Sequence, residues 1–195
     1  MNRKVIKVLE FENKNNIRKK VLIYGEDGSG KSTFAEKYCI KENLNAVCLD
    51  VEKTNFTNVP ILKCDLGNDK KATRNIVALI SEVEESEYNT IIIDGISTLL
   101  EILVSDARGM AKYSDRASNF RKITNKLLNT DLNLIFIGQI DMEVIYTPET
   151  QSNKQIIKIN SMVNEKYLTV KTGDGQDAKY TVSIKKYRKI ENGDG

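Results

Sequence analysis

Residues 20–33 read KVLIYGEDGSGKST, a short apolar run followed by a glycine-rich loop and a lysine-serine pair. Within this stretch, residues 25–32 match the pattern G-x-x-x-x-G-K-[ST] of a phosphate-binding loop. The glycines of such a loop let backbone N–H groups come close to phosphate oxygens, and the dipole of the following helix favours an anion at its N-terminus. Because the motif is complete and lies between a strand pattern and a helical pattern, we favour a phosphate site over a glycine turn that merely joins two elements.

The loop predicts a binding site for ATP and Mg²⁺. Lys31 should neutralise the β- and γ-phosphates, and the hydroxyl of Ser32 should ligate Mg²⁺. The predicted nucleotide-binding residues are Gly25, Glu26, Asp27, Gly28, Ser29, Gly30, Lys31, Ser32 and Thr33.

Apolar runs rich in β-branched residues continue along the chain and alternate with helical patterns. Their nearly continuous hydrophobicity is typical of strands covered on both faces, as in a parallel sheet. From residue 141 onward, short alternating segments separated by polar turns predict antiparallel hairpins. The sequence thus predicts an α/β fold, with a mainly parallel central sheet flanked by helices and with C-terminal antiparallel β-hairpins. The expected strands are 21–25, 46–51, 61–66, 90–94 and 134–138. The expected helices are 31–42, 70–86 and 116–130. The expected hairpin segments are 143–147, 154–159, 167–172 and 179–186.

A chain of 195 residues, 40% of them hydrophobic, is long enough for one well-buried domain and short for two. We expect a single domain over residues 1–190. Within it, residues 1–19 should form an N-terminal extension with an edge strand, and residues 141–190 a hairpin-rich part. Residues 191–195 should form a flexible tail.

The composition excludes several kinds of site. Histidine is absent, which excludes Ser-His catalysis and imidazole metal ligands. The three cysteines form no C-x-x-C, so we expect buried apolar side chains rather than a disulfide framework or a zinc site. The sequence begins with no signal peptide and contains no apolar run of ~20 residues, so we expect a cytosolic protein without a membrane partner. The net charge of +3 permits a nucleic-acid partner without requiring one.

Polar side chains follow three of the expected strands. Asp94 ends an apolar strand and would hold Mg²⁺ directly or through water. Glu52 is the candidate general base for the water that attacks the γ-phosphate, with an ordinary exposed loop acid as an equal alternative. Gln139 would contact the γ-phosphate or that water and report hydrolysis to the following segment, unless it is a structural amide. Parallel strands end at one edge of a sheet, so we expect these side chains to lie near the phosphate-binding loop. The candidate catalytic residues are Lys31, Glu52, Asp94 and Gln139, and the candidate metal ligands are Ser32 and Asp94.

Four segments, in this order, resemble the ATPase core of the RecA recombinases: YGEDGSGKST (24–33), CLDVE (48–52), IIIDGISTL (91–99) and LIFIGQIDME (134–143). The resemblance covers roughly residues 20–150 and implies a RecA-like P-loop fold. In it, Glu52 resembles the catalytic glutamate of the family, and Gln139 resembles the glutamine that couples ATP to a DNA-binding loop. That loop would begin near Ile140, although residues 151–154 read QSNK where the family has a pair of glycines.

The sequence shows no counterpart of the separate N- and C-terminal domains of cellular RecA, and it resembles the compact single-strand annealing proteins of bacteriophages, the Sak-type recombinases. This resemblance implies binding of single-stranded DNA, assembly into a homo-oligomeric ring or filament, and annealing or strand exchange during phage recombination. A single-strand-binding protein is a further candidate partner. The resemblance would place the protein in the cytoplasm of the bacterial host.

Two polar segments with scattered cations, 105–118 and 140–160, are candidates for DNA contact, with solvated loops as an equal alternative. Their candidate residues are Arg108, Lys112, Tyr113, Arg116, Tyr146, Lys154 and Lys158. The densest basic cluster is 185–189. By resemblance to a lysine pair of the RecA family, Lys186 and Arg188 would reach the γ-phosphate bound by a neighbouring subunit. DNA contact, or a solvated edge strand protected by its lysines, stays open as an alternative for this cluster.

Two other functions also fit a P-loop. A nucleotide kinase of this length is one, although the region that would form its lid is poor in arginine. A non-catalytic DNA-binding module, in which ATP only sets conformation or oligomer state, is the other. A DNA-dependent ATPase is the preferred hypothesis because it uses all four RecA-like segments.

Overall fold

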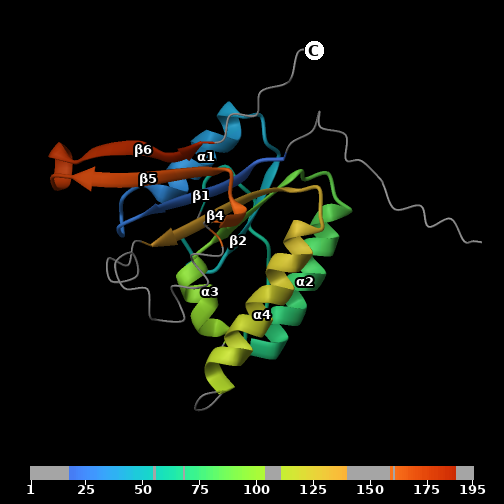
Figure 1. Ribbon diagram of the computed structural model, residues 1–195. Coiled ribbons are helices and arrows are strands. Elements are labelled where there is room, and N and C mark those ends of the chain that lie inside the picture. Colours follow the sequence, from blue (N-terminus) through green and yellow to red (C-terminus); the bar gives the residue numbers. More distant parts are fainter. Residues whose placement is uncertain are drawn as a thin grey trace, which may run out of the picture.

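The computed structural model describes residues 18–54, 56–67, 69–103, 111–139, 159 and 161–187. Over these residues the chain forms one sheet with helices on both faces (Figure 1). The strands are β1 (Lys20–Gly25), β2 (Ala46–Asp50), β3 (Thr90–Asp94), β4 (Asn133–Gln139), β5 (Glu165–Thr172) and β6 (Lys179–Tyr187). The helices are α1 (Lys31–Lys41), α2 (Asp69–Glu84), α3 (Ile96–Ile102) and α4 (Ala111–Leu128), with a short 3-10 turn, η1 (Gly175–Asp177), between β5 and β6.

The strand order in the sheet is β2-β3-β4-β1-β5-β6. The five strands from β2 to β5 run parallel, and only β6 runs antiparallel, against β5. The predicted fold class, a mainly parallel α/β sheet with an antiparallel C-terminal hairpin, is therefore confirmed. The chain leaves β1 toward β2 at one edge and later crosses to β5 on the other side of β1. The sheet order thus reverses beside the end of β1, which is where ligands bind in sheets of this kind.

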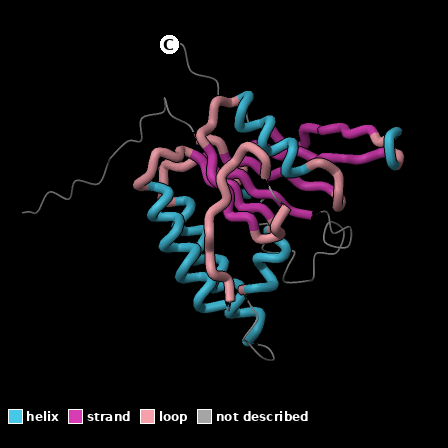
Figure 2. The backbone as a smooth tube through the Cα atoms, turned by 180° about the vertical axis from the view of Figure 1, so that it is seen from behind, coloured by secondary structure: helices cyan, strands magenta, loops and turns pink. Residues whose placement is uncertain are grey.

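Two apolar layers hold the helices against the sheet. On one face, α2, α3 and α4 pack together over the strands, and this layer contains Leu22, Ile76, Leu99, Phe120 and other buried side chains. On the opposite face, α1 packs over a second layer that includes Ile23, Ala35, Cys48 and Ile135. Figure 1 and the reverse view in Figure 2 show this division, and they show the β5–β6 hairpin projecting beyond the other strands.

The expected strand at 61–66 is wrong. This segment makes only an isolated bridge to β2, in which Cys48 N donates to Pro60 O at 2.9 Å and Leu62 N donates to Cys48 O at 2.8 Å. The apolar alternation of the segment reflects packing instead, because Leu62 and Cys64 are partly buried against the core while the ladder of backbone hydrogen bonds is missing.

The C-terminal part differs from the prediction in its pairing. The expected segments at 167–172 and 179–186 form the β5–β6 hairpin, but β5 also pairs in parallel with β1 and so belongs to the central sheet. In the expected hairpin segment 154–159, Ile159 lies in a helical turn. Residues 1–17 of the expected N-terminal extension lie outside the described part of the chain. The expected segments 143–147 and 154–158 and the tail 191–195 also lie outside it.

The predicted helix at 116–130 begins five residues earlier, at Ala111. Residues 111–118 of the candidate DNA segment are therefore helical, and residues 105–110 lie outside the described part of the chain. The cysteines are free; Cys39 and Cys48 are buried as expected, whereas Cys64 is only partly buried. Within the described ranges, every helix is too short or too polar to cross a bilayer.

Candidate functional site

The phosphate-binding loop joins the end of β1 to the start of α1. Gly28 and Gly30 have positive φ angles of 68° and 84°, a backbone conformation that glycine adopts without strain. The loop is also pressed against β5. A Cβ atom on Gly25 would lie 2.4 Å from the carbonyl oxygen of Thr169 and 2.5 Å from Ser29 Oγ, so only glycine fits at this position.

Lys31 lies folded over the loop that it follows. Its ammonium group donates to the carbonyl oxygen of Glu26 at 2.9 Å and to that of Gly25 at 3.3 Å, and the residue is only 8% exposed. These carbonyls fix the cation beside the N–H groups of the loop without neutralising it. The arrangement gives a positive, nearly buried centre at the N-terminus of α1, where an anion is favoured.

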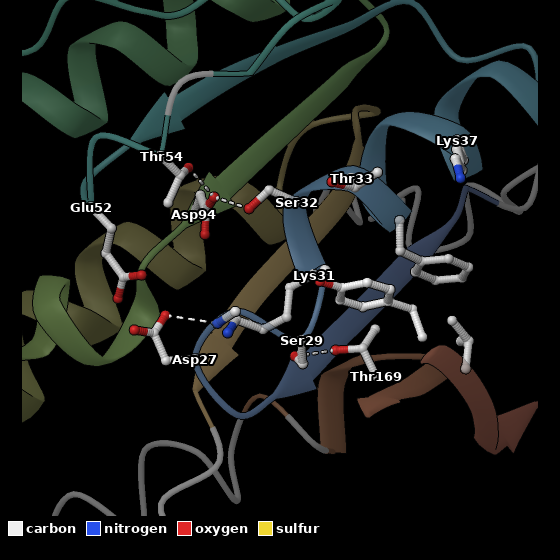
Figure 3. Close-up of a pocket in the computed structure, with 15 residues that line it drawn as sticks. Asp27, Ser29, Lys31, Ser32, Thr33, Lys37, Glu52, Thr54, Asp94 and Thr169 are labelled. Atoms are coloured by element: carbon white, nitrogen blue, oxygen red, sulfur yellow. Dashed lines mark hydrogen bonds between the residues drawn. The ribbon is translucent and has the colours of Figure 1, made fainter. Parts of the chain in front are cut away.

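Asp94, at the end of β3, lies opposite the start of α1. Its Oδ2 accepts hydrogen bonds from Ser32 Oγ and from Thr54 Oγ1, both at 2.8 Å (Figure 3). Burial raises the pKa of the Asp94 carboxyl, as do the nearby charges of Glu52 and Asp50, whereas the two hydrogen bonds lower it. A buried carboxylate beside a serine hydroxyl is a suitable ligand pair for a hard divalent cation.

Glu52 lies just beyond β2 and also lines the cleft. Its Oε1 accepts a hydrogen bond from Thr98 Oγ1 of α3 at 3.1 Å. The end of β2 is itself fixed to β3, because Val51 N donates to Asp94 O at 2.9 Å. The carboxyl groups of Glu52 and Asp94 therefore reach the cleft from neighbouring strands.

The far wall of the cleft comes from the C-terminal hairpin. Thr169 of β5 and Ser29 of the loop share a hydrogen bond of 2.7 Å between their hydroxyl groups. Tyr180 and Val182 of β6 line the cleft, and the Tyr180 ring lies beside Gly30. The cleft has a volume of about 590 Å³, which is in the usual range for a small-molecule site. Its remaining lining includes Phe34 and Lys37 of α1.

A polar and aromatic cluster fixes α1 to the same hairpin. The hydroxyl groups of Tyr38 and Tyr167 donate to Glu165 Oε2 at 2.7 and 2.8 Å. The rings of Phe34, Tyr38 and Tyr167 pack together, and Lys19 pairs with Glu165 at 3.3 Å. Because α1 begins at the phosphate-binding loop, this cluster orients the loop relative to β5 and β6.

Comparison with known proteins places this site in a family. A family model described as an AAA domain, AAA_24, matches residues 17–172 and so covers most of the chain. The chain belongs to this AAA_24 family. No curated protein matches the sequence. Among solved structures, the chain is similar to the crystal structure of a KaiC-like protein from the hyperthermophilic archaeon Pyrococcus horikoshii OT3, with a TM-score of 0.57 and 15% identity over 88% of this chain and 80% of the other. That likeness shows a shared fold.

The chain is thus a P-loop ATPase domain of the RecA and KaiC fold type. Most of the residues predicted for nucleotide and metal binding line one cleft: Asp27, Gly28, Ser29, Gly30, Lys31, Ser32, Thr33, Glu52 and Asp94. Gly25 and Glu26 do not line it; they support the loop from behind through the carbonyls that hold Lys31. Most of the residues that the sequence singled out are thus brought together in one cleft, and their binding roles stay predictions.

Gln139 is the predicted catalytic residue that does not line the cleft. It ends β4, is exposed, and lies in register with Gly25 on the neighbouring strand β1. It lies at the carboxyl end of its strand, as predicted, but it is not among the residues that line the cleft. Its role in coupling stays a prediction.

In the basic cluster at 185–189, Lys186 lies at the end of the β5–β6 hairpin opposite to the phosphate-binding loop of its own chain. Lys186 donates to the carbonyl oxygen of Val163 at 2.6 Å, near the start of β5, whereas the phosphate-binding loop lies beyond the end of β1. Arg188 and Lys189 lie outside the described residues. Of the other candidates for DNA contact, Arg116 is partly buried on α4, and Arg108, Tyr146, Lys154 and Lys158 are likewise outside the described part.

Several residues of the site were missed by sequence reasoning. Thr54 bridges Asp50 and Asp94, with its backbone N–H donating to Asp50 Oδ1 at 3.1 Å. Its only signal was its place just after a strand end. Thr169 and Tyr180 carried no signal, because nothing in the local pattern of β5 and β6 says that this hairpin lies beside β1. The missed cleft residues are Phe34, Lys37, Thr54, Thr169, Tyr180 and Val182.

Among the described residues, no cluster of three or more acidic or thiol side chains could form a metal site by itself. The residues present nevertheless fit Mg²⁺ bound with a nucleotide, because Mg²⁺ is commonly held by one or two protein ligands together with substrate phosphates. Ser32 and Asp94 are that pair, and their side chains already contact one another in the cleft.

Proposed function

We propose that this AAA domain hydrolyses ATP in the cleft between the phosphate-binding loop and the β5–β6 hairpin. The observation that carries the proposal is the meeting in one cleft of Lys31 at the start of α1, Asp94 at the end of β3 and Glu52 just beyond β2. Phosphoryl transfer needs a cation for the phosphates, a ligand for the metal and a group that orients water. The three residues supply one each.

The roles follow from the contacts of each side chain. The loop N–H groups and Lys31 bind the phosphates; Ser32 and Asp94 would hold Mg²⁺, which would supply positive charge to offset that of the phosphates. Glu52 orients the attacking water and accepts its proton as the water oxygen bonds to the γ-phosphorus. The bond from that phosphorus to the β–γ bridging oxygen breaks, and the products are ADP and inorganic phosphate.

The hairpin wall supports a purine rather than a bare polyphosphate. Tyr180 lies beside Gly30 at the loop, and Val182 and Phe34 add apolar surface. A base can stack on an aromatic ring or pack on aliphatic side chains with little demand on exact geometry. We therefore assign the phosphates to the loop and the base to the hairpin.

We further propose that single-stranded DNA stimulates this hydrolysis and that the protein acts as a homo-oligomer in annealing or strand exchange during phage recombination, alone or with a single-strand-binding protein. Support comes from the order of the RecA-like segments and from Gln139. This residue ends β4 next to the strand that carries the loop, and it precedes the segment from 140 that resembles a DNA-binding loop. A change at the γ-phosphate would thus have a short path to that segment.

The test is steady-state ATP hydrolysis with and without single-stranded DNA, together with DNA binding in ADP and in a non-hydrolysable ATP analogue. We expect DNA to raise turnover and the ATP analogue to raise DNA affinity. Glu52→Gln should lower kcat at least about 100-fold while ATP still binds. Glu101→Gln is the matched control, since Glu101 is an exposed glutamate of α3 outside the cleft lining.

The outcomes separate the candidate functions. DNA-independent turnover without DNA binding would refute the recombination half of the proposal and leave the ATPase half. ATP-dependent DNA binding without turnover, unchanged in Glu52→Gln, would identify a non-catalytic module instead. Transfer of phosphate to a nucleoside monophosphate would identify a kinase.

A further inference from the structure

The environment of Glu52 contains one side chain that no part of the proposed function has used. Thr98 lies on α3, and its hydroxyl donates to Glu52 Oε1 at 3.1 Å. Thr98 does not line the cleft, whereas Glu52 does. The hydroxyl therefore touches the candidate base from outside the space that a nucleotide would occupy.

Thr98 lies on a helix that is packed into the core. The next two residues of α3, Leu99 and Leu100, are 0% and 3% exposed, and Leu99 N donates to Gly95 O at 2.8 Å. Gly95 in turn donates its N–H to Ile137 O of β4 at 3.2 Å. Glu52, by contrast, follows β2 in a loop in which Lys53 has a positive φ of 57°. A helix with one face buried in the core thus offers a hydrogen-bond donor to a residue on a loop.

Gly95 makes room for this contact. A Cβ atom at Gly95 would lie 2.6 Å from Cγ and 3.1 Å from Cδ of Glu52, so any side chain there would push the glutamate away. Its φ of 92° is also one that other residues rarely adopt. Glycine at this position therefore both accommodates the backbone conformation and leaves space for the Glu52 side chain.

We propose that Thr98 is a positioning residue for Glu52: its hydroxyl holds Oε1 against α3 and leaves Oε2 directed to the cleft for the attacking water. The inference rests on the proposed function, since it needs Glu52 to be the base. A carboxylate held by one oxygen loses rotational freedom about its last side-chain bond, and correct placement of a base is a large part of its effect. Thr98 contributes to the rate only through Glu52.

The test uses the intact chain with Thr98→Val, which keeps the shape and removes the hydroxyl, and Thr98→Ser, which keeps the hydroxyl. Thr98→Val should lower kcat about tenfold with KM for ATP unchanged, and Thr98→Ser should restore most of the loss. In a Glu52→Gln background, Thr98→Val should change kcat by less than about twofold, because the two residues act as a unit. Ser97→Ala, the loss of a neighbouring hydroxyl on α3 outside the cleft lining, is the control and should match wild type.

Amide hydrogen exchange of residues 51–54 tests the contact between Thr98 and Glu52 without an activity assay. Exchange should be faster in Thr98→Val than in wild type and Ser97→Ala, and close to wild type in Thr98→Ser. If Glu52→Gln turns over normally, Glu52 is not the base; that part of the proposed function fails, and the inference falls with it. If Glu52→Gln is inactive but Thr98→Val has normal kcat and normal exchange, only the inference is overturned. An equal loss of kcat in both backgrounds would also overturn it, because Thr98 would then act on the fold rather than on Glu52.

Discussion

The two walls of the cleft are built in opposite ways. On the phosphate wall, Lys31, Asp94 and Ser29 are 8%, 1% and 2% exposed, and each is hydrogen-bonded to the loop, a neighbouring strand or both. On the hairpin wall, Tyr180 and Val182 are 59% and 43% exposed and lie on a strand at the edge of the sheet. Recognition of phosphate requires charges and N–H groups in fixed places, whereas a base needs only apolar surface. The phosphate wall is accordingly buried and hydrogen-bonded, and the hairpin wall is exposed.

The largest difference between the two walls is expected from substitution of the two α1 lysines that line the cleft, Lys31 and Lys37. Lys31→Ala removes the buried cation of the phosphate wall and should lower ATP turnover by about 100-fold or more. Lys37→Ala removes an exposed cation near the hairpin wall and should mainly raise KM for ATP, by less than about tenfold. Steady-state ATPase assays measure both. Equal losses in the two variants would remove the distinction between the walls.

A smaller effect is expected on the hairpin wall itself. Tyr180→Ala should raise KM for ATP about tenfold with little change in kcat, because stacking of a base on a ring is worth about 1–3 kcal/mol. Tyr180→Phe should stay near wild type. Ile184→Ala is the control, since Ile184 is a more exposed residue of the same strand that does not line the cleft. A fall in kcat at constant KM in Tyr180→Ala would mean that the ring acts on the phosphates instead.

The smallest effect concerns the stability of the phosphate wall without nucleotide. The pKa of Asp94 is raised above its ordinary value of 3.8 in the folded chain, mainly by burial, so the folded state holds this proton more tightly than the unfolded state does. As pH rises from the ordinary carboxyl range through the raised pKa, the stability contributed by protonated Asp94 is lost. Asp94→Asn should therefore raise Tm by a few degrees at neutral pH and flatten its dependence on pH. Thermal unfolding of both proteins across acidic and neutral pH measures this.

Bound nucleotide should make wild type more stable than Asp94→Asn, the reverse of the order expected without nucleotide. Mg²⁺ and ATP compensate the buried charge of Asp94, so they should stabilise wild type more than Asp94→Asn. If Asp94→Asn is less stable than wild type without nucleotide, the hydrogen bonds from Ser32 and Thr54 outweigh the burial of the carboxylate. The phosphate wall would then be stable by itself rather than completed by its ligand.

The residues that sequence reasoning located share one property: each is fixed by a local pattern. Lys31 and Ser32 belong to a contiguous motif, and Asp94 and Glu52 follow apolar runs whose ends must meet at one edge of a parallel sheet. The incorrect strand at 61–66 shows the limit of the same logic. Its apolar residues predicted a strand, and Leu62 and Cys64 do pack against the core, but hydrophobicity reports burial and cannot report which backbone groups pair.

The sequence by itself determined the phosphate half of this AAA domain, because the motif, the strand ends and the helix start are all properties of short segments. Only the tertiary structure decided the other half. Thr169 contacts Ser29 across 140 residues of sequence, and Tyr180 reaches Gly30 from the antiparallel edge strand. Both contacts exist because β5 adds to the sheet beside β1, and strand neighbours are selected by the packing of the whole chain rather than by any local pattern. The contact of Thr98 with Glu52 belongs to the same class, since it depends on how α3 packs beside the end of β2.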